Sequence, residues 1–157
     1  LPPMPDPNVK QEDIKVKERN LFLVFVSGNG NIMAGGQVID IHQLKDKTKD
    51  FILNRFDDPN LPEKEVVEIE MPNGSKWAYP VSQGVVSLQT TRDTGYQVYI
   101  MVQNELTRAF NEVRDEVAMS KFGKKFGDLQ EEESKVITKA VPLKISEAEP
   151  RNMGKKK

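Results

Sequence analysis

Residues 20–53, NLFLVFVSGNGNIMAGGQVIDIHQLKDKTKDFIL, decide the fold of this chain. Residues 20–26 are apolar at almost every position, which predicts a strand that is central in its sheet or buried on both faces. The glycine- and asparagine-rich segment 27–31 predicts a tight turn. Residues 32–39 predict the returning strand, with a bulge or bend at Gly35-Gly36.

A helix is expected directly after this strand pair. Asp40 is a good N-cap, because its carboxylate can accept hydrogen bonds from the first-turn amides of a helix. The side chains that follow at spacings of three and four fall on one helical face, which we expect to be buried. These side chains are Ile41, Leu44, Thr48, Phe51 and Ile52.

Residues 84–118, GVVSLQTTRDTGYQVYIMVQNELTRAFNEVRDEVA, contain a second strand and a second helix. An apolar strand is predicted over 84–89, followed by the polar loop 90–96. The longest helix of the chain is predicted from Thr94 to about Lys121, because one apolar stripe runs along it and indicates a core-facing side. Gly123 suits the residue that ends this helix.

Three further elements complete the predicted architecture. The turn sequence Pro72-Asn73-Gly74-Ser75 predicts a β-hairpin over residues 65–82. Asp128 with Glu131 predicts the start of a short helix that ends near Lys139. Residues 140–145 predict a last strand. The expected fold class is therefore α+β, a two-layer sandwich with a mixed β-sheet, two main helices on one face, an inserted hairpin and an extra short C-terminal helix.

The two ends of the chain differ in composition from the middle. Residues 1–19 begin with prolines at 2, 3, 5 and 7 and continue with charged residues, which is typical of an extended linker. Residues 147–157 are polar and predict a tail, so the domain is expected over residues 20–146. Because the chain begins with Leu1 rather than Met, we expect a membrane segment to precede it in the whole protein.

The composition excludes several kinds of function. The chain has no cysteine and one histidine among 157 residues, which rules out disulfides, thiolate metal sites and cysteine nucleophiles. A net charge of −1 gives a weak overall field, so nucleic-acid binding is not expected. No cofactor or metal-binding residue set is recognisable, and the chain is expected not to be an enzyme.

Three other interpretations of the sequence compete with this expectation. The glycines at 28 and 30 resemble a dinucleotide loop only superficially, since the third glycine is absent and a strand follows. A hydrolase that uses acidic groups with Tyr96 or His42 is one alternative, and it requires a cleft that gathers those residues. A cytoplasmic adaptor domain is another alternative.

The assembled pattern resembles the periplasmic domain of the ExbD/TolR family of biopolymer-transport proteins. The matching pieces are residues 22–26 with the turn 29–33, residues 38–40 leading to Leu44, residues 84–89, and Asp93 to Tyr96 before the long helix. Leu1-Pro2 is similar to the Leu-Pro that follows the membrane helix in that family. The resemblance covers about half of the chain, and its strength lies in the order of these pieces.

The resemblance implies an accessory subunit of a proton-driven energy-transduction complex in the bacterial inner membrane, with this domain in the periplasm. The implied partners are an ExbB/TolQ-like membrane subunit, a TonB/TolA-like transducer, a second copy of the chain, and peptidoglycan. Residues 55–83 and 122–139 are longer than the family pattern. The membrane helix with the proton-carrying Asp lies outside this chain, so proton transfer is assigned to no residue here.

Contacts with these partners are expected to run through strands. A strongly apolar first strand would be costly to leave uncovered, so a homodimer or an added partner strand is expected to cover it. The residues predicted to make these contacts are Phe22, Val24, Val26 and Ile145.

Overall fold

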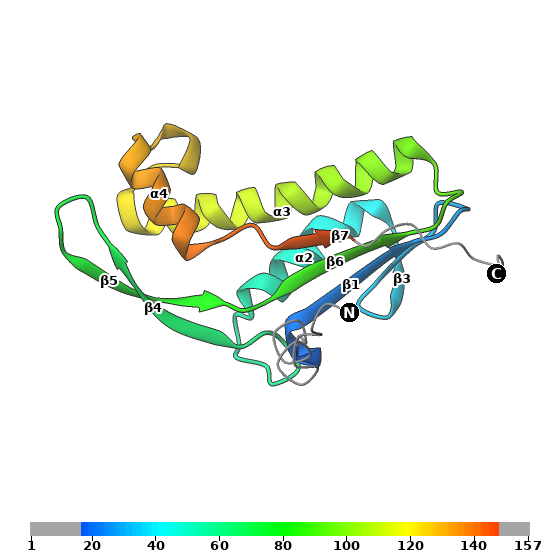
Figure 1. Cartoon of the computed structure of the whole chain (residues 1–157), viewed down its shortest axis with the longest axis horizontal. Coiled ribbons are helices and arrows are strands. Elements are labelled where there is room, and N and C mark those ends of the chain that lie inside the picture. Colours follow the sequence, from blue (N-terminus) through cyan, green and yellow to red (C-terminus); the bar gives the residue numbers. More distant parts are fainter. Residues whose placement is uncertain (1–16, 148–157) are drawn as a thin grey trace, which may run out of the picture.

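The computed structural model describes residues 17–147, and Figure 1 shows their arrangement. Seven strands and three α-helices follow one another, with two short 3₁₀ helices. The elements are η1 (Glu18–Asn20), β1 (Leu21–Val26), β2 (Ile32–Ala34), β3 (Gln37–Ile39), α2 (Ile41–Leu53), β4 (Lys64–Glu70), β5 (Lys76–Ser82), β6 (Val85–Thr90), α3 (Tyr96–Phe122), η2 (Phe126–Asp128), α4 (Glu131–Ala140) and β7 (Ile145–Glu147).

Five strands form a mixed sheet in the order β3-β2-β1-β6-β7. The first strand, β1, is central, as its apolar sequence predicted. It pairs in parallel with β6 along its whole length, from Leu21 opposite Val85 to Val26 opposite Thr90. It pairs antiparallel with β2 over Val24–Val26 alone.

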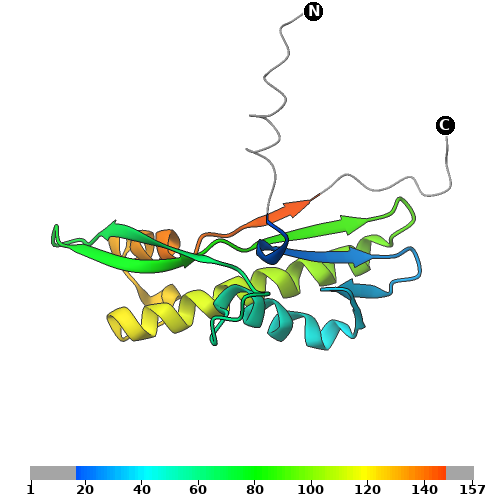
Figure 2. The same ribbon diagram turned by 90° about the horizontal axis from the view of Figure 1, so that it is seen from below.

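The predicted fold class is confirmed. α2 and α3 lie on one face of the five-stranded sheet, and the other face has no helix over it in the described chain (Figure 2). The core fills the layer between sheet and helices, and its largest fully buried side chains include Phe110, Leu44, Leu88 and Leu106. Burying these side chains contributes roughly 1.5–3 kcal/mol each.

Both long helices carry the end signals expected from the sequence. The Asp40 side chain accepts from the His42 amide, and Gln43 Oε1 accepts from the Asp40 amide at 2.8 Å, which forms a capping box. Gly123 ends α3 in the left-handed conformation, with φ of 73°. The two helices are joined at their surface by Glu112, which lies 2.7 Å from Lys45 and 3.0 Å from Lys49.

The predicted hairpin forms a separate two-stranded sheet of β4 and β5. Its register runs from Lys64 opposite Ser82 to Glu70 opposite Lys76. The hairpin extends past the end of the main sheet, over the C-terminal part of α3 and beside α4 (Figures 1 and 2). Ile69 is its best-buried side chain, with 1% exposed.

Three local predictions were wrong. Residues 32–39 are not one strand, because Gly35-Gly36, where a bulge or bend was predicted, form the two-residue turn between β2 and β3, and both glycines have positive φ. α4 begins after Gln130, which forms a capping box with Glu133, and not after Asp128. The last strand starts at Ile145 instead of at residue 140.

The start of the described chain is fastened to the domain. Arg19 Nε donates to the Leu61 carbonyl at 2.8 Å, and the Glu63 amide donates to Asn20 Oδ1 at 2.8 Å. The predicted linker motif Leu1-Pro2 and nearly all of the predicted tail lie outside the described residues.

Candidate interaction surface

The uncovered face of the main sheet is apolar. Side chains alternate along a strand, so every second residue of β1 points away from the helices. Leu21 and Leu23 are each 40% exposed, and Val38 on β3 is 72% exposed. The strand registers place further apolar side chains on the same side of the sheet. The apolar side chains of this open face are Leu21, Leu23, Phe25, Met33, Val38 and Val85.

The strand residues of the open face carry no charge, although Val85 at one end of the face lines a hollow together with Lys17, Arg19 and Lys144. The remaining strand residues that point to this side are Ser87, Gln89 and Ser146, which are neutral. Among the described strands of the sheet, no ionisable side chain points to this side. Contiguous exposed apolar side chains make this face the candidate interaction surface of the described chain.

The residues predicted to make partner contacts lie on the opposite, helix-covered face. Phe22, Val24 and Val26 are at most 8% exposed and belong to the core, so their side chains are not available at the surface. Ile145 is half-buried and in register with buried Val86. The exposed residues of β1 that the sequence did not identify are Leu21 and Leu23. The strand is apolar at every position, so its sequence does not show which side chains face the core.

Strand β7 offers a second way to contact a partner. Within residues 17–147 it pairs only with β6, so its outer backbone edge is open there. Ile145 therefore lies on an edge strand, as a strand-mediated contact requires. Strand β3 forms the other edge of the sheet.

The loop between β6 and α3 is tightly packed against the first turn of the sheet. Thr94 Oγ1 donates to the Val26 carbonyl at 2.9 Å, and Thr91 Oγ1 donates to Asp93 at 2.5 Å. A Cβ on Gly28 would lie 2.3 Å from Asp93 Oδ2, so only glycine fits beneath this carboxylate. The polar loop that the resemblance singled out thus fixes the start of α3.

A cavity of about 270 Å³ lies beside this loop. Tyr96 lines it with Glu147, and Glu147 accepts hydrogen bonds from the Tyr99 hydroxyl at 2.5 Å and from Gln103 at 2.6 Å. The hydrogen bond to Glu147 and partial burial raise the pKa of Tyr99. His42 lies in the first turn of α2 and does not line this cavity, so the two residues of the hydrolase alternative are not gathered there.

The described residues contain neither a metal-binding cluster nor a membrane-spanning helix. Within residues 17–147, no three His, Cys, Asp or Glu side chains are grouped closely enough to hold a metal ion. None of the helices in the same range combines the length and apolarity that crossing a bilayer requires.

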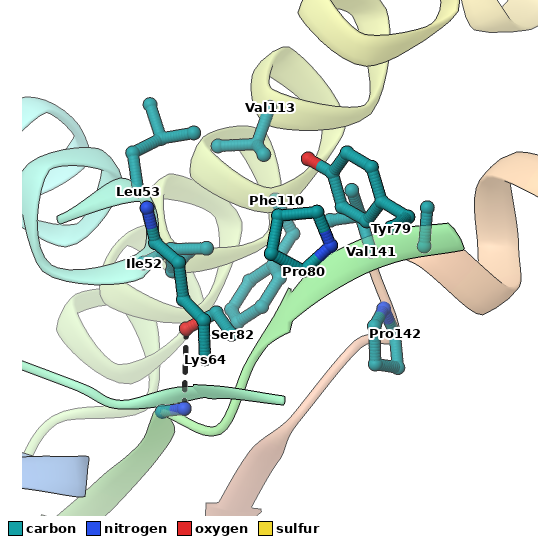
Figure 3. A pocket seen from close by; sticks show the side chains of 12 residues that line it. Ile52, Leu53, Lys64, Tyr79, Pro80, Ser82, Phe110, Val113, Val141 and Pro142 are labelled. Atoms are coloured by element: carbon teal, nitrogen blue, oxygen red, sulfur yellow. Dashed lines mark hydrogen bonds between the residues drawn. The ribbon is translucent and has the colours of Figure 1, made fainter. Parts of the chain in front are cut away.

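A second cavity, of about 100 Å³, lies where the hairpin meets the helices (Figure 3). Its walls are mainly apolar. Lys64 adds an ammonium group to the lining, and Tyr79 adds a phenol. Burial and the negative charge of Glu116 raise the pKa of Tyr79, which keeps its hydroxyl protonated. No local sequence pattern predicts this cavity, because its walls come from five separate segments of the chain.

No protein-family model matches the chain, and no curated protein matches it significantly.

Proposed function

We propose that this chain is the periplasmic module of an ExbD/TolR-like accessory subunit in a proton-driven energy-transduction complex of the bacterial inner membrane. It acts by binding other proteins and passing conformational change to them, and it carries no catalytic step. The single observation that carries the proposal is the open face of the main sheet, which is apolar, uncharged and uncovered in the described chain.

The order of the elements supports the family part of the proposal. The elements β1, β2–β3, α2, β6, the loop with Asp93 and Tyr96, α3 and β7 come in the order of the resembled family, once the inserted hairpin and α4 are set aside and β2 and β3 are counted as one interrupted strand. The two departures from the family pattern pack together at one end, where α4 contacts β4 and β5. This placement leaves the open face of the main sheet clear of both insertions (Figure 2).

The open face suits a second copy of this chain. Two sheets that pack face to face bury their facing side chains about 10 Å apart. Because the face has no charge, two identical faces can meet without like-charge repulsion. The ExbB/TolQ-like subunit, the TonB/TolA-like transducer and peptidoglycan are the further partners of the proposal, with the β7 edge as a place for an added strand.

Disulfide or bismaleimide cross-linking in cells tests the proposal, because the natural chain has no cysteine. The test variant is Val38→Cys on the open face, where the side chain is 72% exposed. The matched control is Lys135→Cys on α4, whose side chain is 69% exposed. Both variants are produced in the full-length protein in its native membrane, and adducts are identified by mass spectrometry.

We expect Val38→Cys to give adducts with a second copy or with a subunit of the membrane complex, while Lys135→Cys gives none. Labelling with a soluble maleimide shows that both thiols are accessible in the purified domain. If Val38→Cys labels readily but gives no adduct in cells, or if both sites give the same adducts, the proposed interaction face is refuted.

A further inference from the structure

We propose that the cavity under the hairpin is a binding site for a small monocarboxylate with a compact apolar body. The site lies between β4, β5, the end of α2, the middle of α3 and the segment after α4 (Figure 3). This inference is independent of the proposed function, because none of these residues belongs to the open face of the main sheet.

The walls of the cavity are rigid and apolar. Phe110 and Val113 of α3 are at most 2% exposed, and Ile52 of α2 is 5% exposed. Val141 and Pro142 form the opposite wall, beyond Pro80. Side chains that are held this firmly by the core cannot collapse into the space, so the cavity persists when it is empty.

The volume sets the size of the ligand. Protein interiors contain few voids larger than one water molecule, and a cavity of about 100 Å³ is well above that size. An apolar cavity of roughly 150 Å³ accepts a benzene ring. A cavity of about 100 Å³ therefore takes a body smaller than a benzene ring, with at most about five carbon atoms.

Lys64 supplies the charge that selects a carboxylate. Its ammonium group donates to the Asn54 carbonyl at 3.2 Å and lies 3.9 Å from Asp57 Oδ1. The Asp57 side chain is 87% exposed, so water competes for its charge. An ammonium group has three donors, and the Asn54 carbonyl at the C-terminus of α2 occupies one of them. The hydrogen bond to Asn54 uses one N–H group of the Lys64 ammonium, and the other N–H groups can donate to a ligand carboxylate.

Tyr79 supplies a second donor. Its hydroxyl points toward Val113 in Figure 3, and no dashed line joins it to another of the side chains drawn there. Lys64 runs along Ile52 and Leu53 in the same view. A carboxylate held between an ammonium group and a phenol gains charge-assisted hydrogen bonds, and its alkyl or aryl body then contacts the apolar wall.

The test uses hexanoate as the probe and hexanol as its uncharged counterpart, each titrated into the purified chain. Binding is followed by amide chemical shifts in ¹H–¹⁵N spectra. We expect hexanoate to shift amides around Leu53, Ser82 and Gly84. We expect Lys64→Met to lower the affinity for hexanoate by about tenfold or more, as for loss of a charge-assisted hydrogen bond. The affinity for hexanol should remain nearly unchanged.

Two other variants complete the design. Tyr79→Phe keeps the volume of the ring and removes only the hydroxyl, so it should lower the affinity for hexanoate more than the affinity for hexanol. Lys135→Met, on exposed α4, is the control and should change neither affinity. Thermal unfolding of each variant verifies that it is folded.

The proposal is overturned if neither probe shifts these amides. It is also overturned if Lys64→Met weakens hexanol as much as hexanoate, since the site would then be only apolar. Shifts confined to surface lysines elsewhere would show nonspecific binding of the anion and would refute the site as well.

Discussion

Val24→Ala and Val38→Ala make a direct test of the two faces of the main sheet. Val24 is fully buried under the helices, and Val38 is 72% exposed on the open face. Both changes remove the same atoms from strands of the same sheet. A difference in the free energy of unfolding therefore reports how completely each face is covered.

The expected magnitudes follow from burial. Removing two methyl groups from a buried valine costs about 1.6 kcal/mol in transfer free energy, and the remaining cavity raises the cost to about 2.5 kcal/mol. Val38 has roughly a quarter of its surface covered, so its truncation should cost about 0.4 kcal/mol in the isolated chain. The two variants should differ by about 2 kcal/mol.

Urea unfolding measures both values, with far-UV circular dichroism and the fluorescence of Trp77 as two probes. Coincident transitions verify that unfolding is two-state. If a second copy covers the open face, the cost of Val38→Ala should grow as the protein concentration rises, because dimerisation stabilises the folded state by mass action. An equal loss for both variants at low concentration would refute the reasoning, since the open face would then be covered within the chain.

Three further predictions follow from other parts of the structure. Gly28→Ala should destabilise the fold by about 1–3 kcal/mol in urea unfolding, and Asp93→Ala in the same chain should recover part of the loss, because the new Cβ would overlap the Asp93 carboxylate. Lys45 and Lys49 of α2 donate to Glu112 and hold the pKa of its carboxyl below the usual value of 4.5. The ionised Glu112 therefore stabilises the folded state above pH 4.5, and this stabilisation is lost as the pH falls through the lower folded-state pKa. Urea titrations from neutral to acidic pH should show this loss, and Glu112→Gln should reduce it. Gly95→Ser should raise the free energy of unfolding by about 0.5 kcal/mol or less, because Gly95 is the N-cap of α3, makes no side-chain cap and has free space around a Cβ; a lower free energy of unfolding in urea would contradict this.

The elements with strong local signals were predicted well. The hairpin formed because residues 72–75 favour a turn whatever surrounds them, and α2 began where Asp40 can cap it. The stripe of α3 identified its buried side correctly, with Leu106, Phe110 and Val113 in the core.

The wrong predictions concern element boundaries that depend on contacts between residues far apart in the sequence. η2 is held by Asp115, whose Oδ1 accepts from the Phe126 amide at 3.0 Å, so the chain turns once before α4 begins. Pro142 has no backbone amide to donate to a sheet, which delays the last strand until Ile145. A local sequence pattern contains neither effect.

The choice between the two faces of β1 also depended on distant contacts. Phe22 and Leu23 are both apolar, and only the packing of α2 and α3 makes one a core residue and the other a surface residue. The interaction surface could therefore be anticipated as belonging to this strand, but its side chains could not be identified from the strand alone.

The direction of the strands has a mechanical consequence. β1 and β7 both run parallel to β6, so β1 begins opposite Val85 at the start of β6 and β7 ends further along the same strand, opposite Leu88. A pull between Leu21 and Glu147 would act along the strands as shear, and the hydrogen bonds between them would share the load instead of opening one after another. This geometry resists tension applied between those two residues.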